Sequence, residues 1–164
     1  MKKIESYFAS CPRELESLLE KQITSFGITQ TQIEPGGVSF ECDFLETLQV
    51  ILKSRIASRV FKQLQTYLIK NERELYDRAR EKWWHEVFDL DQTFKINTLL
   101  SRDAQLKFKN SVFLSQKLKD AIVDQFREKL GARPNVDTEM PDVSILMRIQ
   151  EHAKPGFFVA SINL

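Results

Sequence analysis

The order of six short periodic segments within residues 1–70 constrains the fold of this chain more than any other feature. Four apolar or alternating runs are typical of strands, at residues 4–9, 28–33, 38–42 and 59–69. Helical spacing of apolar side chains follows Pro12 and again follows Asp43, which predicts two helices between the strands. The order is therefore β-α-β-β-α-β, the split βαβ or ferredoxin-like arrangement of an α+β protein.

Local signals mark the ends of these elements. Asp43 and Glu46 have the spacing of a capping box, and Gly27 suits the residue that ends the first helix. The Pro-Gly-Gly at residues 35–37 predicts the turn of a hairpin between the second and third strands. We expect the second helix to bury one apolar stripe, made of Leu45, Leu48, Leu52 and Ile56.

Residues 71–164 predict the order α-β-α-β-β. Asn71 and Glu74 can cap a first helix with Leu75, Ala79 and Trp83 facing inward. The segments after it are a strand at residues 94–100, a basic loop at 101–110, a long helix, and strands at 143–149 and 158–162. Ser111 can cap the long helix, and Gly131 ends it. We therefore expect a ferredoxin-like subdomain at residues 1–70 and a second domain core at residues 71–164. The last strand runs to Leu164, which also suits a segment of a longer chain.

Composition and charge exclude several classes of protein. With 24 basic and 23 acidic side chains the formal net charge is only +1, so nucleic-acid binding would depend on local clusters of basic residues. Two cysteines cannot complete a four-ligand zinc site, and we expect both to be reduced thiols of a cytoplasmic protein. No apolar run approaches the length of a membrane span, and no signal-peptide core follows Lys2 and Lys3.

The sequence contains no recognisable catalytic motif. His85 and His152 lie far apart and lack the spacing of a metal-binding pair, and neither a glycine-rich nucleotide loop nor a GxSxG nucleophile motif occurs. The loop acids Asp137, Glu139 and Asp142 are more typical of caps and turns than of an acid–base pair. We therefore predict no catalytic residue and no metal ligand, so the chain would not be an enzyme by itself.

The best candidate for a binding surface is the segment from Arg102 to Asp120, which carries five basic and two acidic side chains. The N-terminus of the long helix within it offers free N–H groups and the positive end of the helix dipole, which favour phosphate. Basic side chains on an amphipathic helix are equally typical of a solvated face, and Phe108 is more typical of a core. Charge alone leaves RNA binding and a plain solvated surface as equal alternatives.

Two segments resemble the THUMP domain of bacterial RNA methyltransferases. They are Asn110–Asp124 (NSVFLSQKLKDAIVD) and Arg133–Asp137 (RPNVD), with Pro141 and Asp142 following. The match is closest to the 23S rRNA guanine-N2-methyltransferase family, whose N-terminal region the runs at residues 36–40 and 55–59 also resemble. The resemblance implies a ferredoxin-like subdomain packed with a THUMP domain (αβαββ), and the family's THUMP boundary would begin near residue 43.

The same resemblance implies a function. The chain would be the RNA-binding module of an rRNA methyltransferase and would position structured RNA, 23S rRNA in particular, for a catalytic domain that uses S-adenosylmethionine and is missing from residues 1–164. We expect neither a membrane nor DNA as a partner. The expected RNA contacts are Lys107, Lys109, Asn110, Lys117, Arg133, Asn135, Arg59 and Arg55, the basic residues as phosphate ligands. Both asparagines are equally suited to capping or turn formation.

Three alternatives stay open. The RNA-binding part of a tRNA-modifying THUMP enzyme would carry the same features. An acylphosphatase-like hydrolase would need an arginine cradle with a nearby asparagine in its first half, and residues 1–70 contain no asparagine. A protein-interaction or ligand-sensing module would bind a partner and show no affinity for RNA.

Overall fold

The computed structural model describes residues 3–108 and 110–164, which form two compact units. Unit 1 comprises Met1–Leu64 with Asn163, and unit 2 comprises Gln65–Ile162 with Leu164. Strand β4 (Arg59–Ile69) therefore contributes residues to both units. The domain limits expected from the sequence, at residues 70 and 71 or near 43, stay predictions.

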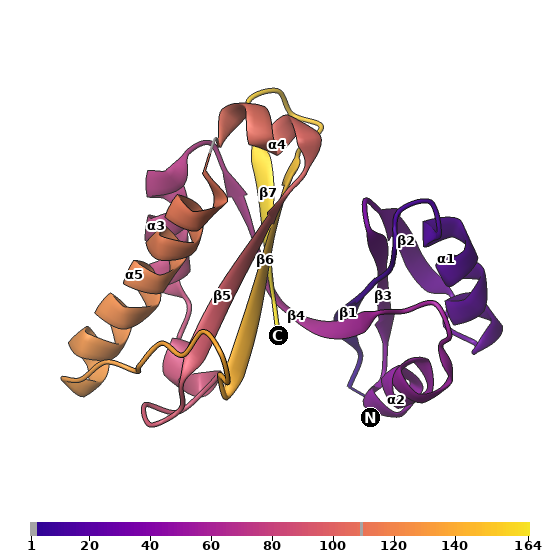
Figure 1. Cartoon of the computed structure of the whole chain (residues 1–164), viewed down its shortest axis with the longest axis horizontal. Helices are drawn as coiled ribbons and strands as arrows, with labels where there is room; N and C mark the ends of the chain where they lie inside the picture. The colour runs from indigo at the N-terminus through magenta and orange to yellow at the C-terminus, as the bar shows by residue number, and fades with distance from the viewer. Residues whose placement is uncertain (1–2, 109) are drawn as a thin grey trace. The chain divides into compact units, whose positions relative to one another are not determined.

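Unit 1 has the ferredoxin-like order expected from the sequence. Its elements before β4 are β1 (Glu5–Ser10), α1 (Glu16–Ser25), β2 (Gln30–Glu34), β3 (Gly37–Cys42) and α2 (Phe44–Lys53). The strands lie in the order β2-β3-β1-β4, and each neighbouring pair is antiparallel. Figure 1 shows α1 and α2 on the same side of these strands, as in a two-layer α+β fold.

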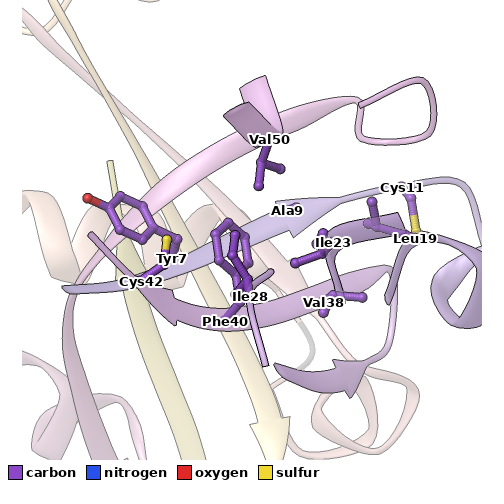
Figure 2. Close-up of a cluster of buried hydrophobic side chains, with 10 residues drawn as sticks. All are labelled: Tyr7, Ala9, Cys11, Leu19, Ile23, Ile28, Val38, Phe40, Cys42 and Val50. Atoms are coloured by element: carbon purple, nitrogen blue, oxygen red, sulfur yellow. The ribbon is translucent and has the colours of Figure 1, made fainter. Parts of the chain in front are cut away.

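Alternation along the strands builds the core of unit 1. Tyr7 and Ala9 of β1 face the same side as Val38, Phe40 and Cys42 of β3, and all five are buried. Leu19, Ile23 and Val50 cover them from the two helices, and Figure 2 shows Val50 above the strands that carry Ala9 and Phe40. Cys11 and Cys42 are buried free thiols, and burial raises the pKa of both.

The cap of α2 is confirmed, whereas its expected apolar stripe is wrong. The Asp43 side chain accepts from the N–H of Glu46 at 2.9 Å, and the Glu46 side chain accepts from the N–H of Asp43 at 3.0 Å. The helix buries Thr47 and Val50 and leaves Leu45 and Leu52 exposed. Thr47 can be buried because its hydroxyl donates to the carbonyl of Asp43, so no polar group is lost from water without a partner.

Two other details of unit 1 depart from or refine the sequence prediction. Helix α1 begins at Glu16 rather than near Pro12, because a turn closed by the N–H of Leu15 on the carbonyl of Pro12 comes first. The hairpin turn is confirmed, with Gly36 at φ 81°. A Cβ on Gly37 would lie 2.1 Å from the carbonyl oxygen of Ala9, so this strand pair also needs glycine there.

Unit 2 adds the following elements to the end of β4: α3 (Glu72–Glu81), the 3₁₀ turn η1 (Trp84–Glu86), β5 (Phe94–Leu100), α4 (Arg102–Lys107), α5 (Ser111–Leu130), β6 (Val143–Glu151) and β7 (Phe158–Asn163). The strand order is β4-β7-β6-β5, with β5 parallel to β6. Figure 1 shows α3 and α5 together on one side of β5 and β6. Aromatic rings fill the space beneath α5, where Phe88 lies 5.4 Å from Phe94 and 5.1 Å from Phe126 between centroids.

Three sequence predictions for unit 2 need correction. Residues expected as a loop contain α4, because the Ser101 side chain accepts from the N–H of Ala104 and starts a helix there. Asn110, rather than Ser111, caps α5. Trp84 enters the core in place of Trp83, because α3 ends at Glu81 and η1 turns the next indole inward.

None of the helices in the described parts of the chain combines the length and apolar character that crossing a membrane requires.

Candidate nucleic-acid interface

A cavity of about 700 Å³ lies in unit 2 beside α5. Helix α5 faces it with side chains three or four positions apart, at Lys117, Asp120, Asp124 and Arg127. The rest of the lining comes from α3, from α5 and from the loop after α5: Tyr76, Lys119, Val123, Arg133, Pro134, Asn135 and Val136. We call this site the α5 cavity.

The loop after α5 is held in place by the first residue of β5. The N–H of Phe94 donates to the carbonyl of Asn135 at 3.0 Å, and the N–H of Asp137 donates to the carbonyl of Phe94 at 3.2 Å. Gly131 ends α5 in the left-handed conformation and turns the chain toward this short parallel bridge. Arg133 and Asn135 therefore sit on a backbone anchored at both ends.

Basic side chains outnumber acidic ones in the α5 cavity. Lys119 lies 2.9 Å from Asp120, and Arg127 lies 3.8 Å from Asp124, so these pairs partly neutralise each other. Lys117 and Arg133 have no ion-pair partner among the described residues. The cavity thus offers two uncompensated cations, and a planar guanidinium at Arg133 matches the geometry of a phosphate.

Tyr76 supplies a polar group on the α3 side of the cavity. Its hydroxyl donates to the carboxylate of Asp124 at 2.6 Å, and this hydrogen bond, with partial burial, raises the pKa of Tyr76. The hydroxyl therefore stays protonated at neutral pH and fixes the Asp124 side chain. Because one oxygen of Asp124 accepts from Tyr76, less of its charge is available to oppose an anion in the cavity.

The structure brings three of the eight predicted contact residues together. Lys117, Arg133 and Asn135 line the α5 cavity. Lys107 ends α4 and is exposed, and the Asn110 side chain caps α5 by accepting from the N–H groups of Val112 and Phe113. Seven residues separate Asn110 from Lys117, which is about 10 Å along a helix axis, so Asn110 and Lys107 mark the N-terminal end of α5.

The other predicted residues lie elsewhere. Arg55 and Arg59 are exposed residues of unit 1, where Arg55 follows α2 and Arg59 begins β4. Lys109 falls outside the residues that the structure describes.

Sequence reasoning missed Tyr76 and Arg127 as cavity residues. The helical spacing of Lys117, Asp120, Asp124 and Arg127 could have indicated Arg127, because the four positions fall on one face of α5. No local pattern could have indicated Tyr76, which reaches the cavity from α3 across 48 residues of chain.

Two of the three loop acids, Asp137 and Asp142, hold turns and loops together, as the sequence suggested. The Asp137 carboxylate accepts from the N–H groups of Glu139 and Met140, which lowers its pKa. The Asp142 carboxylate accepts from the N–H and the hydroxyl of Thr93, which lowers its pKa as well. No cluster of three or more potential metal ligands occurs among residues 3–108 and 110–164.

Comparison with known proteins agrees with this architecture. The family model of the THUMP domain matches residues 69–153, and that of the RlmL ferredoxin-like domain matches residues 6–61. The ribosomal RNA large subunit methyltransferase K/L of Buchnera aphidicola subsp. Acyrthosiphon pisum is 36% identical over 138 residues, which is 84% of this chain and 19% of that protein. The enzyme of the same name from Acinetobacter baylyi is 30% identical over 152 residues, covering 88% of this chain and 20% of that protein.

Solved structures share the fold at lower identity. One is described as a predicted N6-adenine-specific DNA methylase from Listeria monocytogenes. The two structures match with a TM-score of 0.74 at 20% sequence identity, and the matched region is 98% of this chain and 40% of the Listeria chain. The present chain thus spans about a fifth of the length of the curated relatives named above. The expected resemblance to the THUMP domain is confirmed: the chain belongs to the THUMP domain family, with an RlmL ferredoxin-like domain ahead of the THUMP domain.

Proposed function

We propose that this chain is the RNA-binding part of a methyltransferase acting on large-subunit ribosomal RNA, and that the α5 cavity holds the sugar–phosphate backbone of structured RNA. The observation that carries the proposal is the placement of Lys117 and Arg133, two cations without ion-pair partners in the part of the chain described, around one cavity. The relatives named ribosomal RNA large subunit methyltransferase support the RNA class.

Recognition of the RNA sugar–phosphate backbone suits both the α5 cavity and structured RNA. The grooves of an A-form helix hide the base edges from side chains, so structured RNA is held largely through phosphate and ribose. Lys117 and Arg133 would bind phosphate, and the exposed Asn135 side chain would contact ribose. Lys107, Lys109 and Asn110 would extend the contact along the N-terminal end of α5, and Arg55 and Arg59 would contribute from unit 1.

Methyl transfer belongs, in this proposal, to a part of the protein outside residues 1–164. The donor S-adenosylmethionine carries a sulfonium cation, and the α5 cavity does not fit it because basic residues predominate in its lining. The RNA-binding module would position a base of 23S rRNA for that part, with guanine N2 as the methylated atom. A cytoplasmic location and the absence of a DNA partner stay predictions.

The test measures binding of a labelled stem-loop RNA across a salt series. We expect Kd to rise steeply with salt, and the double substitution Lys117→Glu with Arg133→Glu to weaken binding and flatten the salt dependence by about one unit of log–log slope per lost phosphate contact. Lys21→Glu with Lys53→Glu, at two exposed residues of unit 1, is the matched control for the charge change. A double variant that is folded by circular dichroism and binds with unchanged affinity and slope excludes this cavity.

A DNA of the same sequence is the second arm of the test. We expect weaker binding to DNA than to RNA, because the proposal includes contacts to the ribose 2′-hydroxyl. Equal affinity for the two would contradict the RNA class.

A further inference from the structure

Trp83 and Trp84 are adjacent in sequence but lie in opposite environments. Trp84 is fully buried, and its indole N–H donates to the carbonyl of Ala79 at 2.8 Å. Trp83 is 55% exposed. The accessible indole of Trp83 offers an apolar face that a ligand can contact, whereas the indole of Trp84 is enclosed in the core.

The backbone around Trp83 is held by one buried side chain of α5. The Gln125 side chain accepts from the N–H of Trp84 at 2.7 Å and donates to the carbonyl of Lys82. It also donates to the carbonyl of Arg80 at 2.7 Å. Because the residues on both sides of Trp83 are fixed, the outward direction of its indole is built into the fold.

The surroundings of the indole are cationic and aromatic. The ammonium of Lys129 lies 5.7 Å from the centre of the Trp83 ring, and the His85 ring lies 5.5 Å away at an interplanar angle of 32°. An ammonium beside an aromatic ring suits a nucleotide, because the ring can stack on a base while the cation binds its phosphate.

A continuous row of contacts connects Trp83 with the α5 cavity. Helices α3 and α5 meet at Tyr76 with Asp124, and again at Arg80 with Glu128 at 2.7 Å. The guanidinium of Arg80 also lies 5.7 Å from the centre of the Tyr76 ring. Lys129 is five residues beyond Asp124, which is about 7.5 Å along the helix axis and about 140° around it. An RNA strand held in the cavity would therefore have to follow the contact between α3 and α5 to reach Trp83.

We infer that Trp83, with Lys129 beside it, is a stacking platform for an unpaired RNA base adjoining the α5 cavity. The inference rests on the proposed RNA binding and adds a substrate class to it: structured RNA with a single-stranded nucleotide next to a helix. Stacking on an aromatic ring tolerates any base, so the platform selects unpaired RNA without selecting its sequence.

The test combines tryptophan emission with anisotropy of the labelled RNA, using a blunt stem-loop and the same stem-loop with a short single-stranded overhang. Trp83 is accessible to solvent and Trp84 is not, so a base stacked on Trp83 should quench part of the emission. We expect quenching with the overhang RNA only. Trp83→Ala should weaken binding of that RNA about tenfold and leave the blunt RNA unaffected.

Two variants make the result specific. Trp83→Phe keeps a stacking ring, so it should bind the overhang RNA well while the quenching disappears. Leu52→Ala removes an exposed apolar side chain of unit 1 and should change neither signal. If both RNAs bind the unmodified protein but Trp83→Ala changes the affinity for both by the same factor, or for neither, Trp83 is not a stacking platform and the proposed function stands. If neither RNA binds the unmodified protein, both are wrong.

Discussion

The buried side chain of Gln125 holds the end of α3 and the residues after it against α5. Gln125 is 3% exposed, and its amide connects α5 with the backbone after α3 through three hydrogen bonds. Glutamine is usually found on the surface, so no pattern in the sequence indicated that Gln125 would be buried. By contrast, Phe108 was expected in a core and is buried there, 5.0 Å from Phe158 between ring centres.

Gln125→Glu should destabilise the protein by about 3 kcal/mol at neutral pH, because a carboxylate cannot donate to two carbonyl groups and would be buried beside them. Gln116→Glu makes the same chemical change at an exposed position of α5 and should stay within about 0.5 kcal/mol. Urea denaturation of the two variants measures the difference. Equal stabilities would show that the Gln125 amide does not hold α3 and α5 together.

Helix and strand limits were predictable where a cap or a turn residue marks them. Asp43 with Glu46, Asn71, and Gly131 all act as the sequence indicated. Helix α4 was missed because six residues are too few to show helical periodicity, although Ser101 stands at its cap. The α5 cavity was only partly predictable, because Lys117 and Arg133 belong to recognisable segments whereas Tyr76 arrives from α3.

Strands β1 and β4 share an ion cluster that gives a pH prediction. Lys3 and Lys62 both donate to the Glu5 carboxylate at 2.8 Å, and these bonds lower the pKa of Glu5 from 4.5 to about 2. A carboxyl group whose pKa is lower in the folded than in the unfolded protein stabilises the fold at any pH above the unfolded-state pKa. This contribution is lost as the pH falls from about 4.5 toward 2.

Glu5→Gln should therefore reduce the free energy of unfolding at pH 7, and the difference from the unmodified protein should disappear by about pH 2. Urea denaturation at a series of pH values measures it. Glu41→Gln on β3 serves as the control for removing one negative charge from the same sheet. A difference that grows as the pH falls would contradict the assigned role of Glu5.

At the scale of the whole molecule, the sequence predicted the strand at residues 59–69 but assigned all of it to the first subdomain. The structure divides it, because β4 pairs with β1 over Arg59–Lys62 while Gln65–Ile69 belong to unit 2. Periodicity identifies a strand and its faces but does not name its partners, which lie far away in the sequence. The α5 cavity, in contrast, lies within unit 2 alone.

A shared strand should couple the stability of the units. Both tryptophans lie in unit 2, so their emission reports that unit alone. Ile23→Ala in the core of unit 1 should cost about 2–5 kcal/mol and should lower the denaturation midpoint seen by tryptophan emission as well as by circular dichroism. Leu52→Ala, 80% exposed, is the control and should move neither midpoint appreciably. A tryptophan midpoint unaffected by Ile23→Ala would show that the units unfold independently.

The position of β4 across both units also limits where the two domains of different family members can be joined in a chimera. The two family matches leave residues 62–68 between them, and this interval lies inside β4. A crossover there would fuse half a strand from each parent, and the hybrid strand would have to fit β1 at one end and β7 at the other. A crossover just after Ile69 keeps β4 whole and from one parent. In such a chimera the only new strand pairing is that of β4 with β7 from the other parent.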